Sequence, residues 1–151
     1  MNDEASVLET LLGNWNNNIA TRYSELANAS AYLNSIFENI NWVGFYLKDG
    51  DNLKLGPFQG KIACSTVAFD RGVCGKAYRD AKTVVVDNVH TFDDHIACDS
   101  ETNSEIVVPL IANDEVVGLI DIDSLNFARF SDKDKELLEE MAIIIVNTLF
   151  L

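Results

Sequence analysis

Apolar positions repeat with a helical period at both ends of the chain. Near the N-terminus the spacing is three or four residues, first at Leu8, Leu11, Leu12 and Trp15, then more loosely at Leu26, Ala29, Ala31, Leu33 and Phe37. Gly13 is expected to interrupt or kink the first segment. Near the C-terminus, Ser131 and Asp134 resemble a capping box before an apolar stripe at Leu137, Leu138, Met141, Ile144, Ile145 and Thr148. Helices are therefore predicted over the first 40 residues and from Ser131 onward.

The middle of the chain changes to a period of two. Strands are predicted at residues 41–48, 53–59, 62–69, 83–87, 104–111 and 116–124, with a short helix at 72–80. Asn113-Asp114 is the turn of a hairpin between the last two strands. Helices followed by a meander of strands and a final helix predict an α+β domain with an antiparallel sheet. The chain of 151 residues shows no repeat or linker, so residues 1–151 are expected to form a single domain.

Residues 88–103 form a polar stretch with two histidines and Cys98, predicted as one long loop. Structureless loops of this length inside compact domains are usually functional. This loop is therefore the first candidate for chemistry.

The overall charge restricts the partners. Eleven basic against 24 acidic residues give a net charge of −13. Such a surface repels phosphate backbones and anionic lipids, so we expect neither nucleic acid nor membrane as a partner. The acidic start, without a following long apolar run, differs from a secretory signal and favours a cytoplasmic location, where cysteines stay reduced.

The acidic charge is concentrated in one segment. Residues 83–128 contain no lysine or arginine. Most of their carboxylates are expected on a solvated face, as at Asp93, Asp94, Asp114 and Glu115. Asp121 and Asp123 differ because they alternate within an apolar strand, which places both on one face. Adjacent like charges destabilise a fold unless a cation or a shared proton offsets them, so this pair predicts a cation site or a raised carboxyl pKa.

Alternation also places Trp42, Gly44 and Tyr46 on one face of the first strand. Two interpretations fit: an ordinary core face, or an aromatic-walled slot left open at the glycine. A slot of this kind suits a sulfonium-like or methylthio group.

The three cysteines are Cys64, Cys74 and Cys98, an odd count whose spacing matches neither a zinc ribbon nor a Cys-x-x-Cys redox motif. A metal site would need Cys64, Cys98, His90 and His95, which lack paired short spacing, so no metal is expected.

The thiols differ in local electrostatics. Cys74 lies in Gly72-Val73-Cys74-Gly75 at a predicted helix start, where the dipole is expected to lower its pKa. Cys98 lies among carboxylates, which are expected to raise its pKa. Local electrostatics therefore favours Cys74 as the reactive thiol.

Several segments together resemble one family. They are residues 41–47 (NWVGFYL), 56–61 (GPFQGK), 71–75 (RGVCG), 95–99 (HIACD), 103–110 (NSEIVVPL) and 118–124 (GLIDIDS). In these segments the chain resembles the free methionine-R-sulfoxide reductases over nearly its whole length. The resemblance implies a GAF-like fold, a six-stranded antiparallel sheet flanked by helices.

The resemblance also implies roles for individual residues. Cys98 matches the nucleophile, Cys64 its usual disulfide partner, and Cys74 the third thiol of the catalytic set, which leaves both Cys64 and Cys74 as candidates for the thiol that pairs with oxidised Cys98. The substrate-binding positions are matched by Trp42, Tyr46, Glu105, Asp121 and Asp123.

The implied activity is reduction of free L-methionine-(R)-S-oxide to L-methionine through a sulfenic acid and an intramolecular disulfide. An external dithiol, thioredoxin by resemblance, would restore the thiols, and no bound cofactor is implied. The long N-terminal helices are compatible with a homodimer. The alternatives are a ligand-sensing GAF module and a redox-sensing domain that uses the same disulfide without turnover.

Strand register sets a geometric condition for a pocket shared by Glu105, Asp121 and Asp123. A two-residue loop pairs Ala112 with Glu115 and, counting back, Glu105 with Ile122. Glu105 would then face away from Asp121 and Asp123, because a slip of one residue reverses every side chain. A shared pocket requires a three-residue loop or a β-bulge, for which Pro109 is the expected place.

Overall fold

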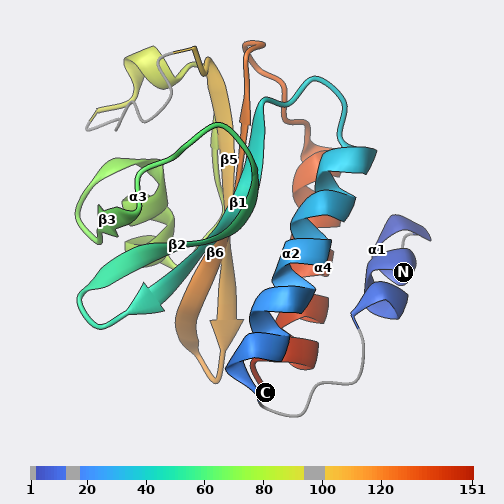
Figure 1. Ribbon diagram of the computed structural model, residues 1–151. Coiled ribbons are helices and arrows are strands. Elements are labelled where there is room, and N and C mark those ends of the chain that lie inside the picture. The colour runs from blue at the N-terminus through green and yellow to red at the C-terminus, as the bar shows by residue number, and fades with distance from the viewer. Residues whose placement is uncertain (1–2, 13–17, 94–100) are drawn as a thin grey trace.

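The chain forms one antiparallel sheet with helices on both faces (Figure 1). This computed structural model describes residues 3–12, 18–93 and 101–151. The helices are α1 (Asp3–Leu11), α2 (Ile19–Ile36), α3 (Gly72–Asp80), the 3-10 turn η1 (Val89–Thr91) and α4 (Asp132–Leu149). The strands are β1 (Trp42–Asp49), β2 (Asn52–Gly60), β3 (Thr66–Ala68), β4 (Val84–Val86), β5 (Ser104–Ala112) and β6 (Glu115–Ser124).

The six strands lie in the order β3-β2-β1-β6-β5-β4, and every neighbouring pair is antiparallel. The predicted α+β class and six-stranded antiparallel sheet are therefore confirmed. The long strands β1 and β6 form its centre, so their side chains are covered on both faces. None of the helices within the described ranges is long and apolar enough to span a bilayer.

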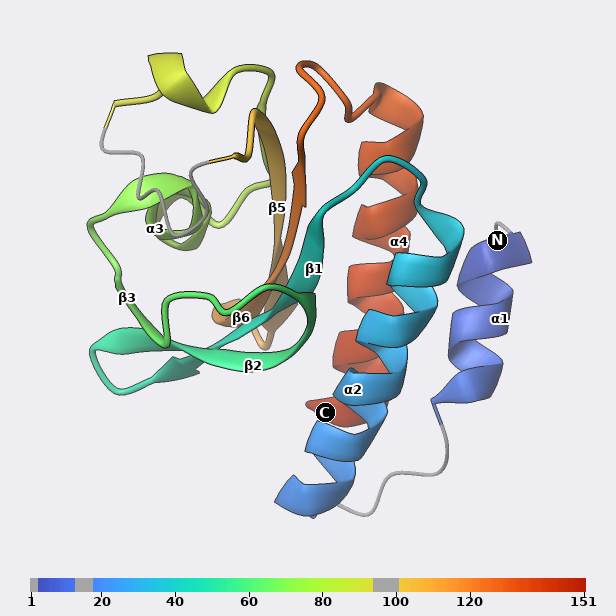
Figure 2. The same ribbon diagram turned by 45° about the horizontal axis from the view of Figure 1, so that its top comes forward.

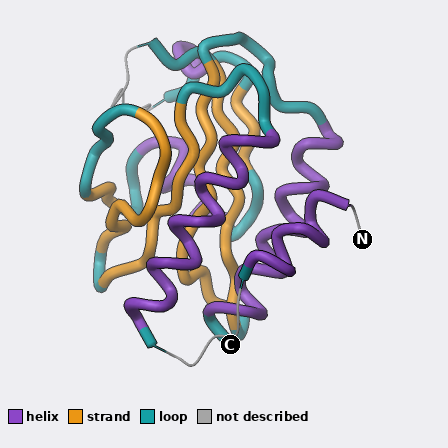
Figure 3. The backbone as a smooth tube through the Cα atoms, turned by 45° about the vertical axis from the view of Figure 1, so that its right-hand side comes forward, coloured by secondary structure: helices purple, strands orange, loops and turns teal. Residues whose placement is uncertain are grey.

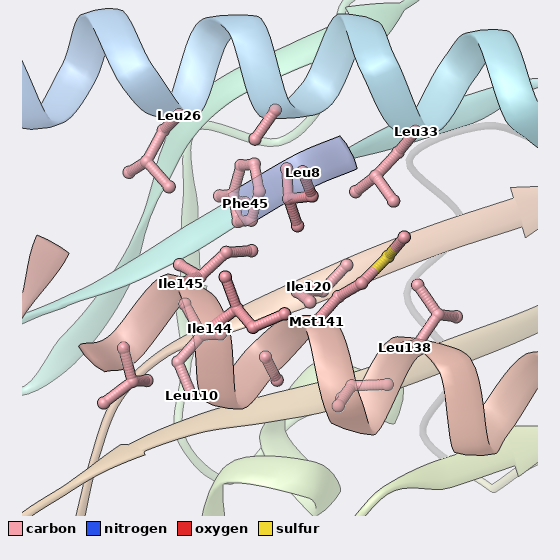
Figure 4. Packing of buried hydrophobic residues seen from close by; sticks show 14 of the residues in the cluster. Leu8, Leu26, Leu33, Phe45, Leu110, Ile120, Leu138, Met141, Ile144 and Ile145 are labelled. Carbon is pink, nitrogen blue, oxygen red and sulfur yellow. The ribbon is translucent and has the colours of Figure 1, made fainter. Parts of the chain in front are cut away.

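Helices α2 and α4 cover one face of the sheet, and α1 packs on their outer side, as Figures 2 and 3 show from two directions. The apolar stripes of α2 and α4 meet the alternate residues of the strands, which include Phe45 and Ile120. Figure 4 shows Leu26 and Leu33 of α2 and Met141 of α4 around these residues, all of them fully buried. Each large apolar side chain buried in this way stabilises the fold by about 1.5–3 kcal/mol. This layer supplies the main core.

The ends of the helices follow their capping residues. Ser131 accepts a hydrogen bond from Asp134 N, and the Asp134 carboxylate accepts one from Ser131 N, which confirms the capping box. Arg129 adds an ion pair to Asp134 at 2.9 Å. At the other end of the chain, the Asn18 side chain accepts hydrogen bonds from the first turn of α2. The break predicted at Gly13 falls outside the described residues, between α1 and α2.

The strand predicted at residues 62–69 is only partly present. β3 contains residues 66–68, and residues 61–65 form a loop. Gly60 has a φ of +136°, which turns the chain out of β2 before it returns to pair with that strand. Ile62 consequently lies 92% exposed although its residue type favours strands.

The long loop after β4 is also partly ordered by local contacts. The side chain of Asn88 accepts a hydrogen bond from His90 N at the start of η1. Val89 is fully buried, and its N–H donates to Asn103 O. The prediction that all of 88–103 is structureless is therefore wrong at 89–91. Residues 94–100, which include His95 and Cys98, lie outside the described residues.

The β5–β6 hairpin contains the irregularity that its geometry requires. Asn113 and Asp114 have φ values of 52° and 65°, as in a type I′ turn, and Ala112 pairs with Glu115. The register then shifts between Leu110 and Ile111, which leaves Val117 as an extra residue on β6. The bulge is therefore confirmed, but it lies beyond Pro109, which pairs regularly with Leu119.

Deleting Val117 tests the importance of this bulge. Without Val117 the pairs Ile111–Val116 and Leu110–Gly118 become consecutive, so a regular hairpin still holds Glu105 opposite Asp123 and keeps the carboxyl groups in the pocket. We expect the free energy of unfolding to fall by no more than about 1–2 kcal/mol, for the loss of the half-buried Val117 side chain. Urea unfolding followed by circular dichroism measures the change.

The matched control is Val117→Ala, which shortens the side chain but keeps the residue count. It should retain most of the stability. A deletion variant less stable than this control by about 3 kcal/mol or more would show that the hairpin cannot close in this register without the extra residue.

Candidate active site

A pocket lies on the sheet face opposite α2 and α4, lined in part by α3 and by the loop between β2 and β3. Its volume is about 60 Å³, which suits a small molecule. The described residues that line it are Trp42, Tyr46, Lys61, Ile62, Ala63, Val67, Arg71, Gly72, Val73, Cys74, Thr102, Glu105, Asp121 and Asp123. All five of the substrate-binding positions implied by the resemblance are among them.

Trp42 and Tyr46 form an aromatic wall. Their ring centroids lie 6.1 Å apart, and Phe58 stacks on Trp42 at 5.3 Å. Gly44 between them does not leave an empty slot, because a Cβ there would lie 2.6 Å from Trp42 Cη2. The glycine instead makes room for the indole. The two rings are 4% and 3% exposed, so they belong to the core and to the pocket wall at once.

Three carboxyl groups meet on the same face. The bulge places Glu105 opposite Asp123, while β1 places Gly44 opposite Asp121. Glu105 and Asp121 are buried, and Asp123 is half-buried. The prediction that Asp121 and Asp123 share a face is confirmed, and Glu105 joins them.

The cluster distributes its protons unequally. Burial, then the neighbouring charges of Asp121 and Asp123, raise the pKa of Glu105 well above its usual value, and hydrogen bonding to both aspartates raises it further. Burial also raises the pKa of Asp121, but hydrogen bonds from Glu105 and Cys74 oppose that rise. Burial and hydrogen bonding both raise the pKa of Glu105, whereas hydrogen bonds oppose the rise at Asp121, so Glu105 is the carboxyl of this pair that more readily keeps a proton.

One oxygen of the cluster lacks a partner. Oδ1 of Asp121 is buried and accepts no hydrogen bond from the described residues. A buried acceptor without a partner is costly, and such groups usually mark the place of a ligand or an ordered water. This oxygen therefore marks a place for a cationic or proton-donating group of a ligand.

Cys74 is buried in the first turn of α3, and its thiol is free. Burial, then the carboxylates of Asp121 and Glu105, raise its pKa well above the usual value. The expectation that the helix dipole lowers this pKa is therefore wrong, because desolvation and nearby negative charge outweigh the dipole. The neutral thiol instead donates to Asp121 Oδ2 over 3.5 Å.

Cys64 is half-buried on the loop between β2 and β3 and is disulfide-bonded. The Tyr46 hydroxyl donates to Cys64 O over 2.9 Å. Cys98, the residue implied as nucleophile, lies outside the described residues, as does His95. The structure thus places the thiol implied as disulfide partner beside the pocket.

Two of the four residues considered as metal ligands, Cys64 and His90, are described, and both have other partners. Cys64 is disulfide-bonded, and Nε2 of exposed His90 hydrogen-bonds Asn103 Oδ1 over 2.7 Å. Within the described ranges one group has ligand atoms close enough for a cation: Cys74, Glu105 and Asp121, all within 4.8 Å. These atoms belong to the carboxyl pocket itself.

Sequence reasoning missed the two cations among the described lining residues, Lys61 and Arg71. The Lys61 side chain is 71% exposed and pairs with Glu101 at 3.2 Å, so it lies on the solvent side of the pocket. Arg71 is the exposed N-cap residue of α3. Lys61 ends the motif GPFQGK and Arg71 begins the motif RGVCG, so these motifs were the sequence signal that could have identified the two cations.

Comparison with known proteins gives consistent matches. The GAF domain family matches residues 18–149. The free methionine-R-sulfoxide reductase of Escherichia coli (strain K12) is 50% identical over 116 residues, covering 77% of this chain and 70% of that protein. The enzyme of the same name from Saccharomyces cerevisiae is 47% identical, covering 80% and 71%.

Solved structures agree with the sequence matches. The reduced form of fRMsr of Staphylococcus aureus superimposes with a TM-score of 0.90 at 42% identity, covering 97% of this chain and 92% of that chain. The free methionine-R-sulfoxide reductase from Neisseria meningitidis, in complex with its substrate, gives 0.87 at 39% identity, covering 98% and 91%. Fold, pocket and relatives together place this chain in the GAF-domain family of free methionine-R-sulfoxide reductases.

Proposed function

We propose that this protein reduces free methionine-R-sulfoxide to methionine in the carboxyl pocket. The observation that carries the proposal is the combination of the unpartnered Oδ1 of Asp121 with the raised pKa of Glu105. One group can accept hydrogen bonds from a substrate ammonium while the other supplies a proton. The relatives named for this reaction support the same conclusion.

The pocket fits the two charged ends of a free amino acid. The ammonium binds at the aspartates, where Asp121 Oδ1 lacks a partner. The carboxylate points toward the solvent side, where Lys61 and Arg71 carry positive charge. The methylthio end lies against Trp42 and Tyr46. A peptide-bound methionine sulfoxide lacks both charges, so this arrangement selects the free amino acid.

The first step transfers oxygen from the substrate to the enzyme. Protonated Glu105 donates to the sulfoxide oxygen, which makes the substrate sulfur electrophilic. Cys98 attacks that sulfur, methionine leaves, and Cys98 becomes a sulfenic acid. The substrate sulfur gains two electrons, and the Cys98 sulfur loses two.

Two further steps restore the enzyme. The Cys64 thiol attacks the Cys98 sulfenic acid, which forms the disulfide and releases water. Two observations support Cys98 as the partner: Cys64 is disulfide-bonded, and Cys74 is free. An external dithiol such as thioredoxin, in a reducing cytoplasm, then reduces the disulfide by exchange. These steps require no bound cofactor.

Two serine variants and one assay test this function. Cys98→Ser should form no methionine, whereas Cys64→Ser should still form about one methionine per enzyme, because only the later disulfide step needs Cys64. Methionine released from free methionine-R-sulfoxide without reductant is quantified by chromatography.

Repeating the assay on the wild-type protein with a dithiol present separates the competing functions. A ligand-sensing or redox-sensing module would release no methionine in repeated turnover with dithiol present. Methionine formation by Cys98→Ser would instead reassign the nucleophile, with Cys74 as the next candidate.

The buried, neutral state of Cys74 predicts low reactivity. After oxidation by substrate, iodoacetamide should alkylate Cys74 at pH 8 at least about tenfold more slowly than free cysteine, since the thiolate is the reacting form. Mass spectrometry measures the rate, and the same protein unfolded in urea is the control. Alkylation at the rate of free cysteine would contradict the neutral thiol.

The raised pKa of Glu105 also predicts a pH dependence of stability. The folded state holds this proton at pH values where the unfolded chain has lost it, so the free energy of unfolding falls as pH rises above the unfolded value toward the folded one. Glu105→Gln, which cannot titrate, should reduce this slope. Urea unfolding at several pH values between 5 and 8.5 measures it.

Asp114→Asn is the matched control, because Asp114 is an exposed carboxyl in the hairpin turn and asparagine tolerates its positive φ. This variant should keep the wild-type slope. Parallel slopes for the wild type and Glu105→Gln would show that Glu105 does not hold the proton.

A further inference from the structure

The loop that carries Cys64 is largely exposed at its start. It comprises residues 61–65, between β2 and β3. Ile62 is 92% exposed, and Lys61 is exposed as well. One backbone hydrogen bond, from Leu55 N to Ser65 O over 3.0 Å, fixes its end. Its side chains also hold it, since Lys61 pairs with Glu101 and Cys64 is half-buried and disulfide-bonded, but the rest of its backbone needs attachment from other groups.

Two side chains of β1 provide that attachment. The Trp42 indole Nε1 donates to Lys61 O over 3.1 Å, and the Tyr46 hydroxyl donates to Cys64 O over 2.9 Å. The two bonds therefore reach the first residue of the loop and the cysteine itself. Both donors come from the pocket wall, which is part of the rigid centre of the sheet.

The donors are themselves fixed in place. Trp42 stacks on Phe58, and a Cβ at Gly44 or Gly60 would come within 2.6 Å of its ring. Burial, then the charge of Asp121, raise the pKa of Tyr46, so its hydroxyl keeps the proton that it donates. The tyrosine hydroxyl therefore remains a hydrogen-bond donor at neutral pH.

We propose that Tyr46, assisted by Trp42, is a positioning residue that holds the Cys64 loop in place for disulfide formation. The inference rests on the proposed function, since it assumes that Cys64 condenses with the Cys98 sulfenic acid. In that step the Cys64 sulfur bonds to the Cys98 sulfur, and the sulfenic oxygen leaves as water with the thiol proton. The two sulfur atoms share one electron pair in the new bond. The sulfenic acid is the oxidant and the Cys64 thiol the reductant, so no other reactant is needed.

Holding the loop lowers the entropic cost of this step. If the reduced loop already lies where the disulfide needs it, little freedom is lost when the bond forms. Removal of the Tyr46 hydroxyl frees the reduced loop more than the cross-linked one. The equilibrium between dithiol and disulfide should then move toward the dithiol.

The test measures this equilibrium in the absence of substrate. The full-length protein is equilibrated in buffers of reduced and oxidised dithiothreitol, and the disulfide fraction is read by mass spectrometry after thiol trapping. Tyr46→Phe should lower the equilibrium constant for disulfide formation about threefold to tenfold, the factor expected from one hydrogen bond.

Tyr32→Phe is a matched control. Tyr32 also donates to a backbone oxygen over 2.9 Å, that of Glu4, but in the helical layer. This variant should keep the wild-type constant. A folded Tyr46→Phe protein with the same constant as the wild type and Tyr32→Phe would overturn the inference.

A second variant covers the case in which Tyr46→Phe does not fold. Trp42→Phe removes the donor to Lys61 O and should lower the constant in the same direction. An unchanged constant there would likewise refute the inference. Peptide mapping of the oxidised wild-type protein separates failure of the proposed function from failure of this inference. Absence of a disulfide-linked Cys64–Cys98 peptide would refute the proposed disulfide step. Its presence, together with unchanged equilibrium constants in the variants, would refute only the positioning role.

Discussion

The pocket depends on the β-bulge that leaves Val117 unpaired in the β5–β6 hairpin. Val117 has no partner on β5. From Gly118 to Ser124, β6 is therefore offset by one position relative to the pairing that starts at the turn. Because side chains alternate, the offset puts Glu105 on the same face as Asp121 and Asp123 and leaves the apolar residues between them for the helix-covered core. The chemistry of one face and the packing of the other are thus set by the same irregularity.

Grouping three carboxyl groups in a buried pocket is unfavourable for the empty protein. The fold limits this cost in two ways: Glu105 retains a proton, and the Cys74 thiol donates to Asp121. The helical layer on the opposite face, with residues such as Phe45 and Met141, supplies stability that does not depend on the pocket. The remaining unpartnered oxygen of Asp121 is the part of the cost that a bound ammonium can offset.

The central strand β1 connects these features. Its alternate residues Val43 and Phe45 belong to the helix-covered core, while Trp42 and Tyr46 form the pocket wall. The polar atoms of that wall point to the loop of Cys64 rather than into the pocket alone. The strand β1 thereby fixes both the aromatic wall of the pocket and the loop that carries Cys64.

Local pattern was sufficient for much of this protein. Strand alternation placed Asp121 with Asp123 and Trp42 with Tyr46, and the capping box at Ser131 began α4, because these features depend on neighbours in the chain. The family motifs identified the pocket residues as a set.

Contacts between distant segments decided the rest. The bulge lies beyond Pro109, Gly60 turns residues 61–65 out of the sheet, and burial beside Asp121 raises the pKa of Cys74 although it begins a helix. Register, desolvation and loop attachment arise only when separate strands and helices meet. The sequence alone therefore could not determine the position of the bulge, the path of residues 61–65 or the direction of the pKa shift at Cys74.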